Sequence, residues 1–330
     1  IEPKGSLQLK MVKLFLMRTG ASLFLFFFSL LLYSQVSEGQ WNFRSYLKGF
    51  SNFQKLSTVN ALYAFQYLHH RTNIHYRKGR GHFGLEWRNR MMYLSDDFAQ
   101  ISSQNILNVP ESFVQLSSMY VNQDNLLAHS MIDRLFYEYQ AENWNLTLGR
   151  QRINWGINLA WNPNDIFNAY SFFDFDYEEK QGVDGVFFHR DFENMSYLEL
   201  ATALDSNLEN TSIGIRYGFN ISGYDHQLIM GKAQSDFIIG YGWAGNIKKS
   251  GFKGELSIFK DISISDIAFV SSVSIDYTFK NGLYMNFSHL YNSLGSDNAV
   301  FFRMYQQAVS AKQLSPLEHT LFAQYMYSYS

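Results

Sequence analysis

The fold of this chain can be read from residues 212–221, which spell SIGIRYGFNI. Every second residue of this stretch, from Ile213 to Ile221, is large and apolar, and the residues between them are small or polar. Because successive side chains of a β-strand point to opposite faces, this spacing predicts a strand with one apolar and one polar face. Its one charged residue, Arg216, falls on the polar face.

The same period of two recurs in four further stretches, at residues 85–93, 237–246, 252–258 and 267–280, and their mid-strand charges also fall on the polar face. A soluble β-sheet protein packs its apolar face around a dry core, whereas a transmembrane barrel turns that face to lipid and keeps a polar lumen. Here the apolar face carries large aromatic residues near the strand ends, which would form interfacial girdles: Tyr241, Trp243, Tyr277, Phe279 and Tyr291. We therefore expect an all-β, transmembrane, antiparallel up-and-down β-barrel, with a secreted soluble sandwich as an alternative.

The composition excludes several classes of function. The 330 residues include 27 Lys and Arg against 29 Asp and Glu, so the net charge of −2 gives no electrostatic reason to bind nucleic acid. The chain has no cysteine, which excludes disulfides, thiolate zinc sites and iron–sulfur clusters. We find no phosphate-binding loop and no common hydrolase or metalloprotease motif, so we expect no cofactor and no enzyme activity.

One continuous apolar block lies near the N-terminus, at residues 23–33, and is preceded by Met17 and Arg18. It is shorter than the roughly 20 apolar residues that a membrane-spanning helix needs. A positive start, an apolar centre and a polar exit predict a secretory signal peptide that is cleaved near residues 34–36. We expect residues 1–35 to be upstream sequence plus this signal and residues 36–330 to be the barrel; a membrane-anchoring helix is the alternative.

The period and the turn residues predict fifteen strands, near 59–70, 79–94, 111–121, 127–140, 144–153, 183–190, 194–204, 211–221, 226–234, 236–246, 251–260, 266–280, 283–291, 298–306 and 318–329. Bacterial single-chain barrels have even strand numbers, so we expect about sixteen strands, with at least one C-terminal strand missing from this fragment.

Short periplasmic turns alternate with longer external loops in such barrels. The short turns are expected at 141–143, 191–193, 222–225 and 281–282, and the long loops at 155–182, 205–210 and 292–297. Residues 95–110 form a long connection on the short-turn side and fit this alternation poorly.

The least repetitive segment lies between Asp133 and Asp184. It contains LGRQRINWG at 148–156, WNPNDIFN at 161–168 and EEKQGVD at 178–184. At these residues the chain resembles a family of Gram-negative outer-membrane β-barrels related to porin-like and alginate-export-type proteins. The resemblance covers about residues 130–185 and implies an outer-membrane barrel; Ala169 and Gln181 depart from it, because proline is expected at both positions.

A connection as long as residues 155–182 can fold into a lumen and narrow it. Arg150 and Arg152 share parity on their strand and would point to the same side. We predict that these two arginines line a constriction, opposed by the acidic residues Asp133, Asp165, Glu178, Glu179 and Asp184. The alternative is an interior salt-bridge network that rigidifies or plugs the barrel, since interior ion pairs serve structure as often as transport. Asp165 is also expected to cap a short helix that starts near Ile166.

Three other groups of residues suggest chemistry, and each has a simpler explanation. The histidines at 69, 70, 75 and 82 match no closed metal site, and a solvated loop at 70–80 explains them better. The acidic run at 174–179 lacks the pattern of an EF-hand loop. Ser288 and His289 could suggest a lipase, but adjacent residues on a strand point in opposite directions. We therefore expect no metal site and no catalytic residues.

Together these observations predict a porin-like channel that passively admits small polar solutes across the cell outer membrane. Its expected partners are outer-membrane lipid, the solute and, as an option, further copies of the chain. A closed or plugged barrel with a binding or structural role is the alternative, and an outer-membrane lipase is a more distant one.

Overall fold

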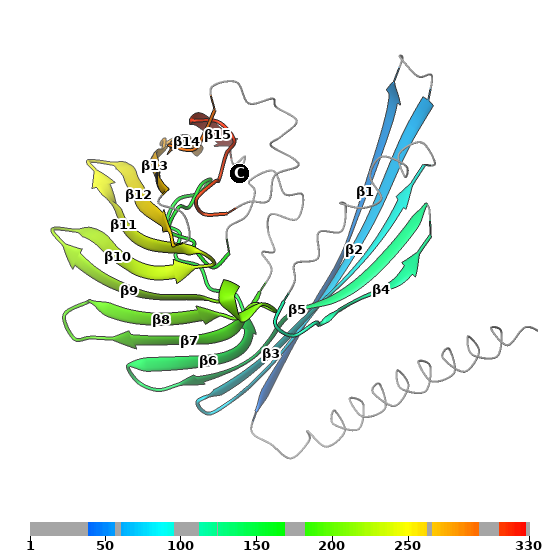
Figure 1. Ribbon diagram of the computed structural model, residues 1–330, viewed down its shortest axis with the longest axis horizontal. Helices are drawn as coiled ribbons and strands as arrows, with labels where there is room; N and C mark the ends of the chain where they lie inside the picture. The colour runs from blue at the N-terminus through cyan, green and yellow to red at the C-terminus, as the bar shows by residue number, and fades with distance from the viewer. Residues whose placement is uncertain are drawn as a thin grey trace, which may run out of the picture. The chain divides into compact units, whose positions relative to one another are not determined.

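The computed structural model describes residues 39–56, 61–95, 112–123, 125–168, 182–262, 266–296 and 310–327 (Figure 1). The chain divides into two units, Ile1–Gln40 and Trp41–Ser330, and almost all of the described residues belong to the second. The predicted signal peptide lies outside the described residues.

The described residues are almost entirely β-strand, because their period-two pattern continues from one turn to the next. The strands are β1 (Gln40–Leu56), β2 (Ala61–Lys78), β3 (Gly81–Leu94), β4 (Ser117–Asn122), β5 (Leu126–Gln140), β6 (Trp144–Gln151), β7 (Val183–Asp191), β8 (Tyr197–Ala203), β9 (Ser212–Ile221), β10 (Tyr224–Ala233), β11 (Asp236–Ile247), β12 (Ser250–Asp261), β13 (Ile267–Thr278), β14 (Leu283–Asn292) and β15 (His319–Tyr327). One short 3₁₀ helix, η2 (Leu208–Asn210), connects β8 to β9.

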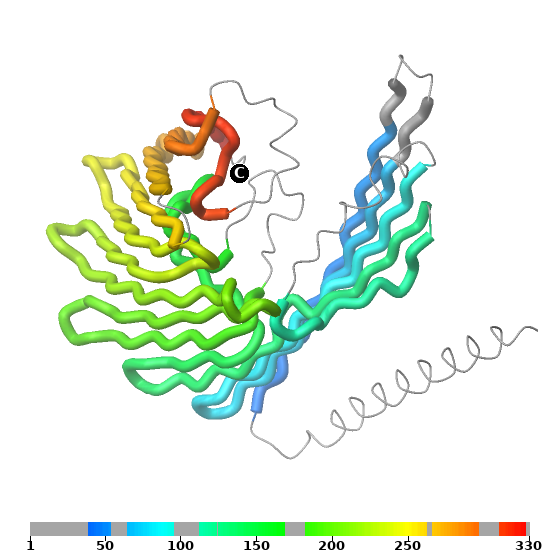
Figure 2. The backbone as a smooth tube through the Cα atoms, viewed as in Figure 1, coloured from blue at the N-terminus to red at the C-terminus, as the bar shows by residue number. Residues whose placement is uncertain are grey.

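In the described part of the chain, all fifteen strands belong to one sheet in which neighbours along the sequence pair antiparallel (Figures 1 and 2). The strand order follows the sequence except at β4, which lies beside β5 and off the main path. The predicted antiparallel up-and-down sheet is confirmed. Among the described residues, β1 and β15 are the two ends of the path.

The N-terminal third of the sheet differs from the prediction. Residues 70–80 are not a solvated loop: β2 continues to Lys78, and a two-residue turn at Gly79 and Arg80 leads directly into β3. A further strand, β1, precedes the first predicted one. Because β4 lies off the main path, only β5 separates the connection after β3 from the short turn at 141–143. The connection at 95–110 therefore falls at the long-loop end, and its poor fit is resolved. The predicted strand at 298–306 lies outside the described residues.

The two faces of the sheet are distributed as the sequence predicts. On the apolar face, large apolar side chains are exposed; examples are Ile215, Leu228, Ile239, Ile258 and Phe287. On the polar face, side chains such as Gln227, Glu255, Ser257, Ser272 and Asn286 are buried. This is the reverse of a water-soluble sheet, which buries its apolar face and exposes its polar one.

A row of aromatic rings runs across the apolar face near the short-turn end of β9 to β12. Each ring centroid lies within 6 Å of the next, and the row consists of Tyr217, Phe219, His226, Tyr241, Trp243 and Phe252. Tyr241 and Trp243 are two of the residues predicted to form a girdle. No helix among the described residues has the length and apolar character needed to cross a membrane.

Candidate functional site on the polar face

Residues 153–168 form an irregular segment that is packed against the polar face of the sheet. Ile153, Trp155, Trp161 and Ile166 are buried in one apolar cluster with residues of β10 to β14. Glycines in the sheet make room for the segment. A Cβ atom at Gly214 would lie 2.8 Å from the Trp155 ring. The small residues of the polar face therefore determine where this segment can pack.

Glu255 of β12 is the main anchor of the segment and is fully buried. Its Oε1 accepts hydrogen bonds from the backbone N–H groups of Ile157 (2.5 Å) and Asn158 (3.0 Å), and its Oε2 accepts one from that of Asn164 (2.9 Å). A buried carboxylate needs several donors to offset its loss of hydration, and this irregular backbone supplies three. One charge thus satisfies three peptide groups that have no strand partner.

Amide side chains fix the segment to the neighbouring strands. The Asn158 amide donates to the Ser272 carbonyl (3.1 Å) and accepts from the Ser274 hydroxyl (2.8 Å) of β13. Similarly, Asn164 accepts from the Ser257 hydroxyl of β12 (2.7 Å). From β10, the Gln227 amide donates to the Trp155 carbonyl (2.9 Å). Residues 153–168 are therefore held along β10 to β13 by specific bonds.

Arg150 and Asp184 form a buried ion pair between β6 and β7. The guanidinium donates from Nε to Oδ1 and from Nη2 to Oδ2, both at 2.7 Å. Arg150 also donates to the backbone carbonyls of Ile132 and Val114. With these four bonds the pair joins β6, β7, β5 and the segment that precedes β4.

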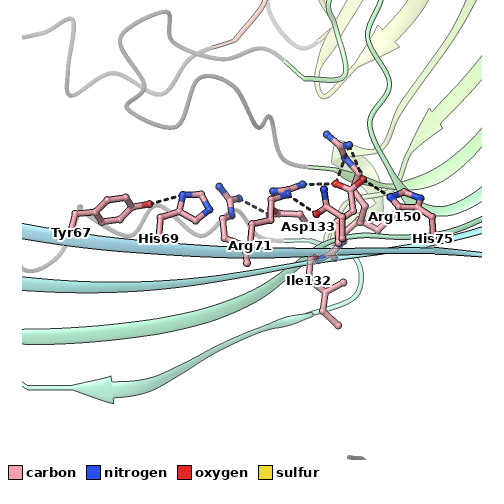
Figure 3. A network of polar contacts seen from close by, with 11 residues as sticks. Tyr67, His69, Arg71, His75, Ile132, Asp133 and Arg150 are labelled. Atoms are coloured by element: carbon pink, nitrogen blue, oxygen red, sulfur yellow. Dashed lines mark hydrogen bonds and ion pairs between the residues drawn. The ribbon is translucent and has the colours of Figure 1, made fainter. Parts of the chain in front are cut away.

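A second charge network lies on the polar face of β2, β3 and β5 (Figure 3). Asp133 accepts from Arg71 (2.5 Å) and from Arg88 (2.6 Å), and all three side chains are buried. Arg71 also pairs with Glu86, which is bound in turn by Arg134 at 3.1 Å. The network is therefore a continuous chain of alternating charges across three strands.

A β-bulge in β5 makes this network possible. Glu86 pairs with Arg134, and Trp87 pairs with Ile132, so Asp133 is the extra residue. A bulge interrupts the alternation of faces, and consecutive residues can then reach the same side. Here it lets both Asp133 and Arg134 contact charges on the polar face.

The structure places the residues predicted for the constriction in different environments. Arg150 is paired with Asp184, whereas the neighbouring Arg152 is exposed. Asp133 belongs to the network with Arg71, apart from Arg150. Glu178 and Glu179 lie outside the described residues. The pore-lining role of these residues stays a prediction.

Asp165 is buried within the packed segment, where its Oδ1 accepts from the Trp155 N–H at 3.4 Å. The short helix expected at Ile166 is not found, because Ile166 to Asn168 have no helical conformation. The Asp165 carboxylate instead bonds to a peptide group ten residues earlier in the chain.

Sequence reasoning missed Glu255 and the cluster of Arg71, Glu86 and Arg88. The period of two places Glu255 on the polar face of its strand, but its burial depends on a segment about ninety residues away. The predicted loop at 70–80 includes Arg71. A signal was present, however, because alternate residues from His69 to His75 are polar or charged and could have been read as a strand face.

Ser288 and His289 do not form a catalytic pair. Ser288 is buried on the polar face and donates to the Asn286 amide oxygen (2.9 Å). The His289 ring instead lies against His319, with Nε2 and Nδ1 3.1 Å apart. In the described part of the chain, no group of three or more His, Asp or Glu side chains is arranged to hold a metal ion.

Comparison with known proteins found no matching family model and no matching curated protein. Among solved structures, the chain is similar to OprD of Pseudomonas aeruginosa at 10% identity and a TM-score of 0.48, with 87% of this chain and 70% of that chain covered. It is also similar to OmpF of Salmonella typhi in a complex with daunomycin, at 9% identity, a TM-score of 0.43 and coverage of 77% and 78%.

A third solved structure, OccK11 (OpdR) of Pseudomonas aeruginosa, is 11% identical with a TM-score of 0.42. The match covers 80% of this chain, which spans 65% of the length of OccK11. The resemblance to alginate-export proteins stays a prediction.

Replacing Arg150 by Ala should destabilise the protein by about 3–5 kcal/mol, because Asp184 would remain buried without its partner. Arg152→Ala is the matched control, since Arg152 is exposed two residues away, and should change stability by no more than about 0.5 kcal/mol. Urea unfolding of the refolded protein, followed by tryptophan fluorescence, measures both. Equal effects of the two changes would contradict the assignment of the buried pair.

Replacing Glu255 by Ala should release residues 153–168 from the sheet, because three peptide N–H groups lose their acceptor at about 1–3 kcal/mol each. Amide hydrogen exchange at residues 157, 158 and 164 should accelerate together. Ser257→Ala, a buried neighbour on the same face, removes one bond to Asn164 and should cost only about 1 kcal/mol. Unchanged exchange in the Glu255 variant would show that the apolar contacts alone hold the segment.

Proposed function

We propose that the chain is a porin-like channel of the bacterial outer membrane that passively admits small polar solutes. The observation that carries this proposal is the reversed distribution of the two faces, with large apolar side chains exposed on β9 to β14 and polar groups buried behind them. Apolar surface is stable in contact with lipid and costs free energy in contact with water. A bilayer therefore provides the environment that this sheet requires.

The aromatic row across β9 to β12 supports the proposal. Tyrosine and tryptophan favour membrane–water interfaces, where the ring contacts lipid and the polar atom contacts water. The aromatic row lies near one end of its strands, which is the position expected of an interfacial girdle. Accordingly, the short turns, including Gly79–Arg80 and residues 141–143, would face the periplasm, and the long loops would face outward.

Closure into a barrel of about sixteen strands is part of the proposal. In the described part of the chain, β1 and β15 each have one strand neighbour. Exposed strand edges are not tolerated in hydrocarbon, where each backbone polar group needs a partner within the protein. The complete protein would therefore pair these edges, directly or through further strands. We also propose that the protein is exported through a cleaved signal peptide and that several copies can assemble.

The packed segment at residues 153–168 would narrow the lumen, as predicted for the connection at 155–182. Arg150 would belong to the wall, and the exposed Arg152 would be the residue that biases charge selection. The alternative of a plugged barrel is favoured by one observation: Glu255 and the amide bonds fix this segment in place rather than leaving it free to move.

The decisive experiment is single-channel recording of the refolded full-length protein in a planar bilayer. Discrete ohmic steps would support an open channel, and Arg152→Ser should then shift its ion selectivity toward cations. Insertion without current would contradict the channel and favour the plugged barrel. A lipid-hydrolysis assay on the same sample would test the lipase alternative.

A charge on the apolar face should test the membrane environment directly. Leu228 lies in the middle of β10 and is 49% exposed, whereas Ile221 ends β9 and is 58% exposed. In a bilayer, Leu228→Lys should cost about 2–4 kcal/mol and Ile221→Lys about 0–1 kcal/mol, because the penalty depends on depth. Unfolding in lipid vesicles measures the difference, and near-equal small costs would indicate a water-exposed sheet.

A further inference from the structure

Two histidines on the polar face meet across the tight turn between β2 and β3. His75 lies four residues before this turn, and His82 lies two residues after it. The Nδ1 atom of His75 is 3.0 Å from the Nε2 atom of His82, and the two rings stack with centroids 5.2 Å apart. Both side chains are partly exposed, at 23% and 12%, so an ion can reach them from solvent.

The second nitrogen of each ring faces a carboxylate. The Nδ1 atom of His82 lies 3.0 Å from Oε2 of Glu138 on β5, and the Nε2 atom of His75 lies 3.5 Å from Oε1 of Glu86 on β3. Phe136 packs its edge against the His82 ring at 5.3 Å. Groups from β3 and β5 therefore hold the two rings.

Proton counting shows what this arrangement allows. An ionised carboxylate only accepts hydrogen bonds, so the Nδ1–H of His82 is turned toward Glu138 and the Nε2 atom of His82 carries the lone pair. His75 either donates its Nδ1–H to that lone pair or, with its N–H on Nε2 toward Glu86, presents a second lone pair 3.0 Å away. In the second tautomer the two nitrogens can bind one metal ion.

We propose that His75 and His82 form a binding site for a divalent transition-metal ion, Cu²⁺ or Ni²⁺, on the polar face at the short-turn end of β2 and β3. An ion about 2.1 Å from each nitrogen would make an angle of about 90° between them, close to that of square-planar or octahedral coordination. Water completes the coordination, which is consistent with the absence of a cluster of three ligand residues in the described ranges.

The two carboxylates face the outer nitrogens of the two ligand rings. A carboxylate bound to the outer N–H of a ligating histidine fixes its tautomer and strengthens it as a ligand. Glu138 is assigned this role for His82. Glu86 also binds Arg71 and Arg134, so it contributes less charge to the site.

The test is Cu²⁺ binding to the detergent-refolded full chain, measured by competition with a chromophoric chelator and by electron paramagnetic resonance. We expect one tight site with nitrogen couplings from two imidazoles. His82→Ala should abolish it. Glu138→Gln, which retains both ligands, should weaken it by about tenfold or more.

The chain offers a matched control in His289 and His319. Their ring nitrogens face each other at 3.1 Å, but no described carboxylate pairs with either ring. His319→Ala should leave the tight site unchanged. Loss of tight binding in this variant, or equal binding in wild type and His82→Ala, would overturn the proposal.

Should His82→Ala fail to refold, an unchanged affinity in Glu138→Gln would overturn the proposal instead. The measurement needs no current, so its failure is distinct from failure of the proposed channel.

Discussion

The structure depends on one constraint, the strict alternation of side chains between two faces of a continuous antiparallel sheet. Once the large aliphatic residues occupy the exposed face, the mid-strand charges of β9 to β13 must lie on the other, and only Lys232 and Lys260, next to the strand ends, share the apolar face. That face then needs partners for its polar groups. Residues 153–168 supply them, and Glu255 shows the relation most directly, since its carboxylate binds three peptide groups that no strand pairs.

Buried charges on the polar face are paired in two different ways. Arg150 and Asp184 form a closed pair with two parallel bonds, which joins adjacent strands. Arg71, Asp133 and Glu86 instead form a branched network in which each group contacts more than one opposite charge. Both arrangements join neighbouring strands, and this favours the structural interpretation of Arg150 over a role as an open pore charge.

Local periodicity was sufficient to predict β7 to β14 to within a few residues, because each strand there keeps one period between recognisable turns. It failed where the pattern is less regular. In β2, three histidines and two arginines resemble a solvated loop, although alternate residues share a face. The contacts of Glu255 could not be predicted at all, since they depend on how a segment far away in the sequence packs. The sequence predicts that Arg150 and Asp184 oppose each other. Their positions in the sequence alone could not predict that both side chains are buried.

The bulge at Asp133 divides β5 into two parts that turn residues of opposite parity to the polar face. Before it, odd-numbered residues such as His129 and Met131 are buried, and after it the even-numbered Arg134 and Glu138 contact the polar face. The strand is thus two half-strands of opposite parity joined at one residue. Removal of Asp133 itself would restore a regular pleat and leave both halves on their present faces. A regular pleat that kept all the residues would turn one half inside out, so the bulge is required as long as the extra residue is present.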